Sequence, residues 1–245
     1  MTSLVRYDVG DRIATATLDS SENRNALSRA LVTELSDRLQ EAAHDPEVRA
    51  VVLTHTGRVF CSGADLAEAG SGQPGTGATT AMMAVMTAIV EMDKPVIAKI
   101  GGHVRAGGMG IVGACDLAVA SQAASFAFTE ARLGLAPAII SLTTLDLMPS
   151  RGASRYYLTG ETFDAETAAA LGLITIATLA DDLDQVIAGL LDQIRQTSPQ
   201  GSAETKKLLT AARRQRLEKD SPALTALSAR LFASDEAQES IHAFL

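Results

Sequence analysis

Cysteine is scarce in this chain of 245 residues, which contains only Cys61 and Cys115. Two thiols cannot build the disulfide framework of a small secreted domain, so we expect both to pack as small buried apolar residues. Basic residues are outnumbered by acidic ones, and the net charge is −8. A general nucleic-acid-binding function is therefore not expected, because such proteins usually present a basic face.

Long apolar runs and common catalytic signatures are also missing. No uninterrupted apolar stretch reaches the ~18 residues of a membrane span, and the start "MTSLVRYDVG" does not have the basic-then-apolar layout of a secretory signal. We therefore expect a cytoplasmic protein with no membrane partner. No H-x-x-x-H or C-x-x-C spacing predicts a metal site, and no G-x-S-x-G elbow indicates a serine hydrolase.

Strand-like and helical patterns alternate along most of the chain. Helical periodicity begins at Ala26 and again covers 79–92, and the Gly-rich segment 70–78 resembles the flexible segments of active-site lids. Alternating or continuous apolar patterns predict strands at 4–9, 12–19, 48–55, 96–100, 116–121, 125–130 and 173–178. We therefore predict an α/β core over residues 1–181, followed by a helical region over 182–245.

A glycine pattern in the middle of the chain resembles a dinucleotide-binding motif. Gly108, Gly110 and Gly113 form G-x-G-x-x-G, and Glu130 follows where such a fold would bind a ribose. However, the nearest expected strand ends at about Ile100, and residues 101–107 separate it from the motif. Because a true fingerprint needs a strand running directly into its first glycine, these glycines are expected to serve another purpose.

An earlier glycine segment, "VFCSGADLAEAG" (59–70), suggests what that purpose is. It follows the expected strand 48–55 and places Gly63 and Ala64 at a tight turn, where backbone N–H groups can face outward. If the N–H groups of Ala64 and Gly107 converged, they would form an oxyanion hole. One such donor can contribute about 3 kcal/mol to stabilising negative charge on a carbonyl oxygen.

Several stretches together resemble the crotonase superfamily, also called the enoyl-CoA hydratase/isomerase family. They are "ENRNALS" (22–28), "VRAVVLT" (48–54), "FCSGADL" (60–66), "KPVIAKIGG" (94–102), "AGGMGIVGACDLAVAS" (106–121) and "AFTEARLGLAP" (127–137). The resemblance implies a ββα spiral core and a helical C-terminal region that assembles homotrimers or dimers of trimers. It also implies acyl-CoA thioester substrates, with coenzyme A as part of the substrate and no permanently bound cofactor.

The resemblance also assigns roles to individual residues. The backbone N–H groups of Ala64 and Gly107 would hold the thioester oxygen. Two loops would border coenzyme A, and they contain Ala26, Leu27, Gly63, Asp65 and Leu66. Candidates for the CoA phosphates are Arg24, Arg58, Lys206 and Lys207, although each of them could equally be a solvated surface charge.

The chain departs from the family pattern at its acid/base residues. Hydratases of the family use two glutamates, of which the first aligns with Gly110 and is absent here, while the second aligns with Glu130. Glu130 is expected at the end of an apolar strand, where desolvation would raise its pKa. The resemblance therefore implies an enoyl-CoA hydratase that works with one glutamate. The alternatives are an enoyl-CoA isomerase and a catalytically impaired acyl-CoA-binding protein.

Other residues near these motifs have competing interpretations. Arg105 could pair with a carboxylate on the acyl group, but more commonly such an arginine ties layers or subunits together. His103 is interpreted as a packed side chain rather than a base, and Asp116 as a structural hydrogen-bonding residue. Helical core packing, with a possible role in shaping the acyl pocket, is expected for the methionines Met82, Met83 and Met86.

Overall fold

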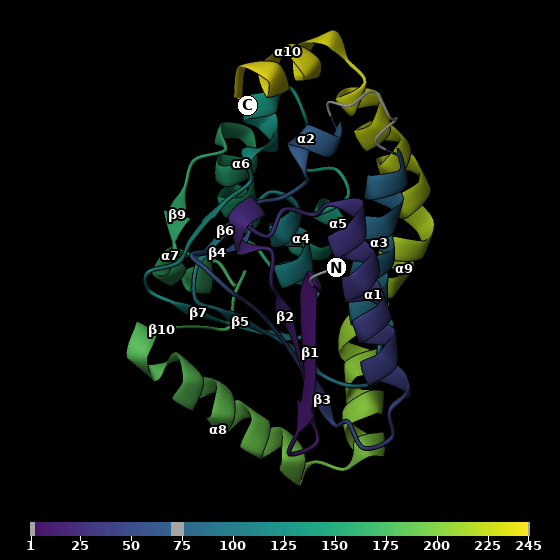
Figure 1. The fold of residues 1–245 in the computed structure, drawn as a ribbon, viewed down its shortest axis with the longest axis vertical. Coiled ribbons are helices and arrows are strands. Elements are labelled where there is room, and N and C mark those ends of the chain that lie inside the picture. The colour runs from purple at the N-terminus through teal and green to yellow at the C-terminus, as the bar shows by residue number, and fades with distance from the viewer. Residues whose placement is uncertain (1–2, 70–75, 245) are drawn as a thin grey trace.

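The computed structural model describes residues 3–69 and 76–244. Most of the Gly-rich segment 70–78 therefore lies outside the described residues. The remainder forms two sheets surrounded by helices, with a long helix along one side (Figure 1).

The larger sheet contains most of the strands that the sequence pattern predicts. Its order is β1-β2-β3-β5-β7-β10, and all neighbouring strands are parallel except the antiparallel pair β1 and β2. These strands span Val5–Gly10, Ile13–Leu18, Ala50–His55, Val96–Ile100, Leu117–Ser121 and Ile176–Thr178, respectively. The apolar, β-branched runs fit such a sheet because its inner strands are covered on both faces.

A second sheet of four short strands was largely missed by sequence reasoning. Its order is β4-β6-β8-β9, and the strands span Val59–Cys61, His103–Arg105, Ser125–Ala127 and Phe163–Asp164. Strands β4, β6 and β8 each follow a strand of the larger sheet, which produces the expected ββα spiral. Because β6 lies within 101–107, the expectation that the nearest strand before the glycine motif ends at about Ile100 was wrong.

The first long helix shows how local sequence sets an element's boundary. Helix α1 (Arg29–His44) begins three residues later than the pattern from Ala26 suggested, because the Ser28 hydroxyl accepts a hydrogen bond from the Leu31 N–H and caps the helix. Helices α1, α3 (Thr76–Glu91) and α9 (Pro199–Phe232) lie side by side in Figure 1. The shorter helices are α2 (Leu66–Ala69), α4 (Gly107–Ala114), α5 (Ser141–Thr144), α6 (Ser150–Thr159) and α7 (Ala165–Ala170).

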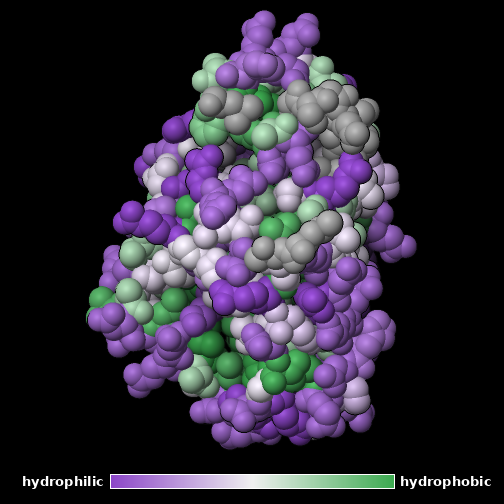
Figure 2. All heavy atoms as spheres, in the orientation of Figure 1, coloured by the Kyte–Doolittle hydropathy of each residue, from purple (hydrophilic) through white to green (hydrophobic). Residues whose placement is uncertain are grey.

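From Leu183 onward the described chain is helical, as expected. Helix α8 (Leu183–Gln196) packs against the larger sheet through Leu183, Ile187 and Leu191, and Figure 2 shows apolar atoms in this lower part of the molecule. Helix α9 then runs back along α3, and α10 (Asp235–Phe244) packs against the 3-10 helix η2 (Thr129–Leu133). The two remaining 3-10 turns are η1 (Ser21–Asn23) and η3 (Ala180–Asp182).

The two cysteines are buried free thiols, which confirms their expected packing role. Burial raises the pKa of Cys61 to about 12 and also raises that of Cys115, so neither thiol is a nucleophile near neutral pH. Within the described ranges, no helix has both the length and the apolar composition required to cross a bilayer. The same ranges contain no cluster of three His, Cys, Asp or Glu residues that could hold a metal ion.

Candidate active site

The two glycine segments meet at Gly63. This residue follows β4 and has a φ of +93°, a conformation that glycine adopts without strain. A Cβ built on Gly63 would lie 2.7 Å from the Cβ of Ala106 and 3.4 Å from the backbone N of Gly107. The turn after β4 therefore touches the start of α4 directly, and a side chain at Gly63 would separate them.

The backbone around Gly107 is held in a strained conformation. Ala106 has φ +45° and ψ −118°, which a residue with a Cβ rarely adopts, and its N–H donates to the Ala127 carbonyl of β8. A Cβ on Gly107 would lie 2.8 Å from Leu27 Cδ1 and 3.9 Å from the Ala64 N. Within residues 3–69 and 76–244, neither the Ala64 N–H nor the Gly107 N–H donates a hydrogen bond to a protein acceptor. The two donors are thus neighbours and are available to a ligand oxygen.

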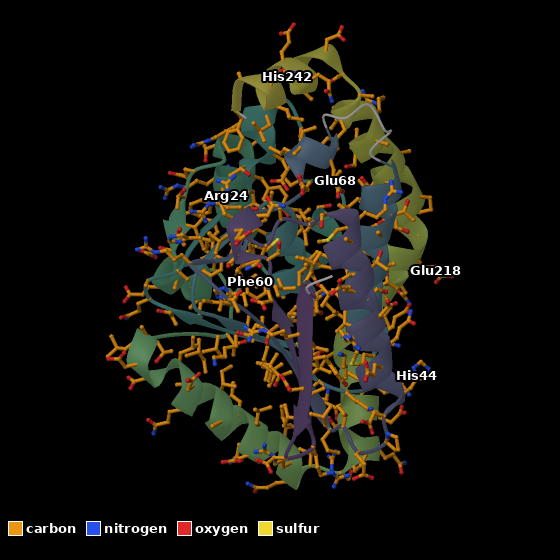
Figure 3. All side chains as sticks on the ribbon, viewed as in Figure 1. Arg24, His44, Phe60, Glu68, Glu218 and His242 are labelled. Atoms are coloured by element: carbon orange, nitrogen blue, oxygen red, sulfur yellow. The ribbon has the colours of Figure 1, made fainter. Side chains whose placement is uncertain are left out.

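A cavity of about 840 Å³ contains both of these donors. It extends from the loop before α1, past α2 and the start of α4, to η2 and the helices α9 and α10. Arg24 and Glu68, labelled in Figure 3, contribute to its wall below α10. The residues that line it include Ala64, Gly107 and Glu130, which the sequence analysis predicted to be catalytic.

Glu130 lies in η2, immediately after β8, rather than at the end of the strand as expected. The strand ends at Ala127, because the chain there turns into the 3-10 helix. The Oε2 atom of Glu130 is buried and has no hydrogen-bond partner in the part of the chain that the structure describes. Burial raises the pKa of this carboxyl to about 7, since the charged form is poorly solvated. Glu130 can therefore both accept and donate a proton near neutral pH.

The two other carboxylates in the described cavity wall are occupied by structural hydrogen bonds. Asp65 accepts from the Asn23 amide at 2.8 Å and from the Ala67 N–H at 3.0 Å, so it caps α2. Glu68 accepts from the Arg29 N–H at 3.0 Å. This contrast distinguishes Glu130 as the carboxyl that is free to act on a bound molecule.

The glycines of the dinucleotide-like pattern allow α4 to pack closely. A Cβ on Gly108 would lie 2.8 Å from that of Cys61, and a Cβ on Gly113 would lie 2.6 Å from the Thr143 carbonyl oxygen. A Cβ on Gly110 would lie 2.6 Å from Ile140 Cγ2. None of these glycines lines the cavity, so the pattern does not provide a pyrophosphate site. These glycines are unavailable to a pyrophosphate because they pack against neighbouring segments, and not because a strand is too far away.

Most of the proposed CoA-binding residues lie in the cavity wall. Arg24, Ala26, Leu27, Asp65 and Leu66 line it, whereas Gly63 shapes it through the turn described above. Arg58 is exposed and does not belong to this wall.

Sequence reasoning missed the residue that fixes the loop before α1. Asn25 is fully buried, accepts from the Ser20 N–H, and donates to the carbonyls of Thr56 and Val59. Its φ of +51° is a conformation that asparagine tolerates better than most residues. The sequence offers no signal for this role, because a polar loop predicts an exposed asparagine as readily as a buried one.

The expectation that Lys206 contacts CoA phosphates was wrong. Its ammonium group is buried, lies 2.7 Å from Asp116 Oδ2, and donates to the carbonyls of Ile89 and Lys94. Lys207 is paired with Glu204 and is not part of the cavity wall. Asp116 has the expected structural role, because its Oδ2 atom pairs with Lys206 and accepts a hydrogen bond from the Val96 N–H.

The guanidinium of Arg105 holds the smaller sheet together. It donates to the Val104 carbonyl and to both the carbonyl and the hydroxyl of Ser125, which joins β6 to β8. These contacts correspond to the layer-tying interpretation. Arg105 also lines the cavity, so its pairing with a substrate carboxylate stays a prediction. His103 Nδ1 lies 2.9 Å from the same hydroxyl, and His103 is absent from the cavity wall. Of the three methionines, Met82 lines the cavity, and all three are buried in the core.

Comparison with known proteins agrees with this architecture. Residues 8–245 match the family model described as enoyl-CoA hydratase/isomerase. The chain is 52% identical to a solved enoyl-CoA hydratase from Mycobacterium avium, with a TM-score of 0.92 and coverage of 100% of this chain and 96% of that one. It is 30% identical over 190 residues to the carnitinyl-CoA dehydratase of Proteus mirabilis, covering 76% of this chain and 73% of the relative. It is also 29% identical to the enoyl-CoA hydratase ACTT6 of Alternaria alternata, covering 93% of this chain and 76% of the relative.

A ββα spiral with the turn after β4 and the start of α4 meeting at one cavity is the architecture of a crotonase-type protein. The chain belongs to the enoyl-CoA hydratase/isomerase family.

Proposed function

We propose that the protein is an enoyl-CoA hydratase in which Glu130 is the only acid/base residue. The observation that carries the proposal is the position of Glu130. Its carboxyl has a pKa of about 7 and a buried Oε2 atom with no partner among the described residues, and Glu130 lines the same cavity as Ala64 and Gly107. A proton-transfer group and an oxyanion hole are the two parts that chemistry beside a thioester carbonyl needs.

The proposed reaction adds water across the C2–C3 double bond of a 2-enoyl thioester. The Glu130 carboxylate takes a proton from water while the water oxygen bonds to C3, and the electrons move to the thioester oxygen. The Ala64 and Gly107 N–H groups stabilise the resulting enolate. The Glu130 carboxylic acid then protonates C2, which restores the carboxylate and completes the net addition of one water.

We further propose that Arg24 contacts a phosphate of coenzyme A and that Ala26, Leu27, Asp65 and Leu66 border the remainder of that group. All of these residues line the cavity. Arg58 remains a weaker candidate, because it lies outside the wall. No permanently bound cofactor enters the proposed reaction, since proton transfer and backbone hydrogen bonds are sufficient for it.

The reaction can be followed by the loss of absorbance of the conjugated enoyl group of crotonyl-CoA. Glu130→Gln should lower the turnover number by about 10²- to 10⁴-fold, the usual contribution of a general acid/base. Glu218→Gln is the matched control, because Glu218 is exposed on α9 and points away from the core in Figure 3. Equal turnover by the parent enzyme and Glu130→Gln would remove Glu130 from the mechanism.

Double-bond isomerisation is the second candidate, and a specific observation favours it. Position 110 is a glycine, and the apolar side chain of Ile140 occupies the space beside it, so the described chain places no second carboxylate at this part of the cavity wall. One carboxyl is enough to carry a proton between C2 and C4 of an enoyl thioester. Conversion of a 3-enoyl-CoA to its 2-enoyl isomer without water addition would establish this activity. Binding of acyl-CoA without any turnover would instead indicate an impaired acyl-CoA-binding protein.

We also propose that the chain assembles as a homotrimer or a dimer of trimers through its C-terminal helical region. Leu208 and Leu209 support this proposal, because both are about four-fifths exposed on α9. The two leucines are adjacent in the chain, and contiguous exposed apolar patches mark sites of protein–protein contact. Sedimentation or light scattering should give three or six times the monomer mass, and Leu208→Asp with Leu209→Asp should reduce it. A monomeric parent protein would contradict the proposal.

A further inference from the structure

The segment of the cavity wall that follows Glu130 is mostly apolar. Apart from Arg132, the cavity residues of this segment have apolar side chains, and they are Leu133, Leu135, Ala136, Pro137, Ala138, Ile139 and Ile140. Within residues 3–69 and 76–244, the buried Oε2 atom of Glu130 has no hydrogen-bond partner. An ordered water in a protein usually needs two to four polar partners. The apolar side chains of this segment supply no such partner, whereas they accommodate the apolar part of an acyl group.

Ile140 is held in this wall by hydrogen bonds to its backbone carbonyl. Its carbonyl oxygen accepts hydrogen bonds from the Thr144 hydroxyl at 2.6 Å and from the Thr143 hydroxyl at 3.2 Å. The Thr143 hydroxyl also lies 2.9 Å from the Gly110 carbonyl oxygen, which ties this segment to α4. The side chain of Ile140 is buried, and it occupies the space into which a Cβ of Gly110 would project.

Gly110 and Ile140 consequently form a matched pair. The Cβ of any larger residue at position 110 would lie 2.6 Å from Ile140 Cγ2 and 2.8 Å from Met86 Sδ. Because Ile140 lines the cavity and Gly110 does not, the side chain of Ile140 separates position 110 from the cavity. Its identity therefore helps to determine the wall that an acyl group in the cavity of Glu130 would contact.

We propose that Ile140 is a specificity-determining residue that sets the ratio of water addition to double-bond migration at Glu130. This inference rests on the proposed function. When the carboxylate of Glu130 takes a proton from C2 of a 3-enoyl thioester and returns one to C4, the double bond moves and no water is consumed. When it takes a proton from water and returns one to C2 of a 2-enoyl thioester, one water is added. The first reaction needs only an apolar wall, and the second needs a second polar contact for the water.

The test uses two substitutions that differ only in polarity. Ile140→Thr places a hydroxyl in the wall, and Ile140→Val is its matched control, because valine has the same branched shape with a methyl group instead. Each variant is given crotonyl-CoA to measure hydration and a 3-enoyl-CoA to measure isomerisation. One hydrogen bond to the water corresponds to a rise of about threefold to tenfold in the ratio of hydration to isomerisation for Ile140→Thr. Ile140→Val should leave the ratio at the parent value.

A threonine hydroxyl can bond to its own backbone instead of to the water, so a second pair of variants is measured in the same way. Ile140→Asn introduces a longer polar group, and Ile140→Leu is its apolar match in size. The same rise in Ile140→Asn but not in Ile140→Leu would support the inference, with thermal unfolding used to verify that each variant is folded. Ratios that do not distinguish polar from apolar variants in either pair would overturn the inference alone. Absence of turnover in the parent enzyme would overturn the proposed function, and the inference with it.

Discussion

Replacement of Glu130 by glutamine tests whether its carboxyl is as poorly solvated as the structure indicates. The substitution keeps the shape of the side chain but removes its ability to ionise. In the parent protein, burial raises the pKa from the usual 4.5 to about 7, so the folded state binds the proton more tightly than the unfolded state does. Ionisation therefore opposes folding, and the parent protein should lose stability as the pH rises from about 4.5 to about 7.

The magnitude follows from the size of this pKa change. Raising the pKa from 4.5 to about 7 costs the folded protein about 3 kcal/mol once the carboxyl is ionised in both states. Glutamine does not incur this cost. Relative to the parent, Glu130→Gln should gain about 3 kcal/mol in the free energy of unfolding at about pH 9 and less than about 1 kcal/mol at about pH 5.

Urea unfolding of both proteins at several pH values measures the difference directly. The exposed Glu218→Gln change on α9 is the control, and it should give no comparable increase between the two pH values. A difference between Glu130→Gln and the parent that stays constant from pH 5 to pH 9 would refute the burial argument. It would mean that water or a shift of η2 solvates the carboxyl in solution.

Three further predictions concern the same residues and their packing. If ionised Glu130 is the base, kcat/KM for crotonyl-CoA should increase with pH and level off above about 7, and a flat profile over this range would contradict that assignment. Lys206→Met should lower the free energy of unfolding by about 3 kcal/mol, because it removes the buried cation that faces the half-buried Asp116 carboxylate. The exposed neighbour Lys207 provides the control, and an equal loss in Lys207→Met would count against the buried pair. Gly110→Ala should cost about 1–3 kcal/mol through overpacking against Ile140, and denaturant unfolding should show that added Ile140→Ala restores part of the loss.

Elements with a long periodic pattern could be predicted from the sequence. Strand β3 follows from a continuous β-branched run, and the leucine repeat of α1 places Leu31, Leu35 and Leu39 in the core. The strands β4, β6 and β9 could not be predicted in this way, because two or three residues are too few to show a period. Their position depends on pairing with strands that are distant in the sequence.

The candidate site divides in a similar way. Glycine and alanine at tight turns are local features, so the sequence was sufficient to predict that Ala64 and Gly107 could supply outward-facing N–H groups. Their proximity, and the placement of Glu130 in the same cavity, depend on how β4, α4 and η2 meet. The role of these residues in catalysis stays a prediction until the experiments above are performed.

Two residues show most clearly what only the tertiary structure decided. Lys206 has the sequence context of an exposed helical lysine, but folding buries its ammonium group and places it beside Asp116. Ile140 resembles any apolar residue, but folding places it over Gly110 and in the wall of the cavity. The sequence by itself determined the periodic elements and the turns, because these depend on neighbouring residues. Burial, ion pairing and the shape of the cavity depend on residues brought together from distant segments, so they emerge only when the chain is folded.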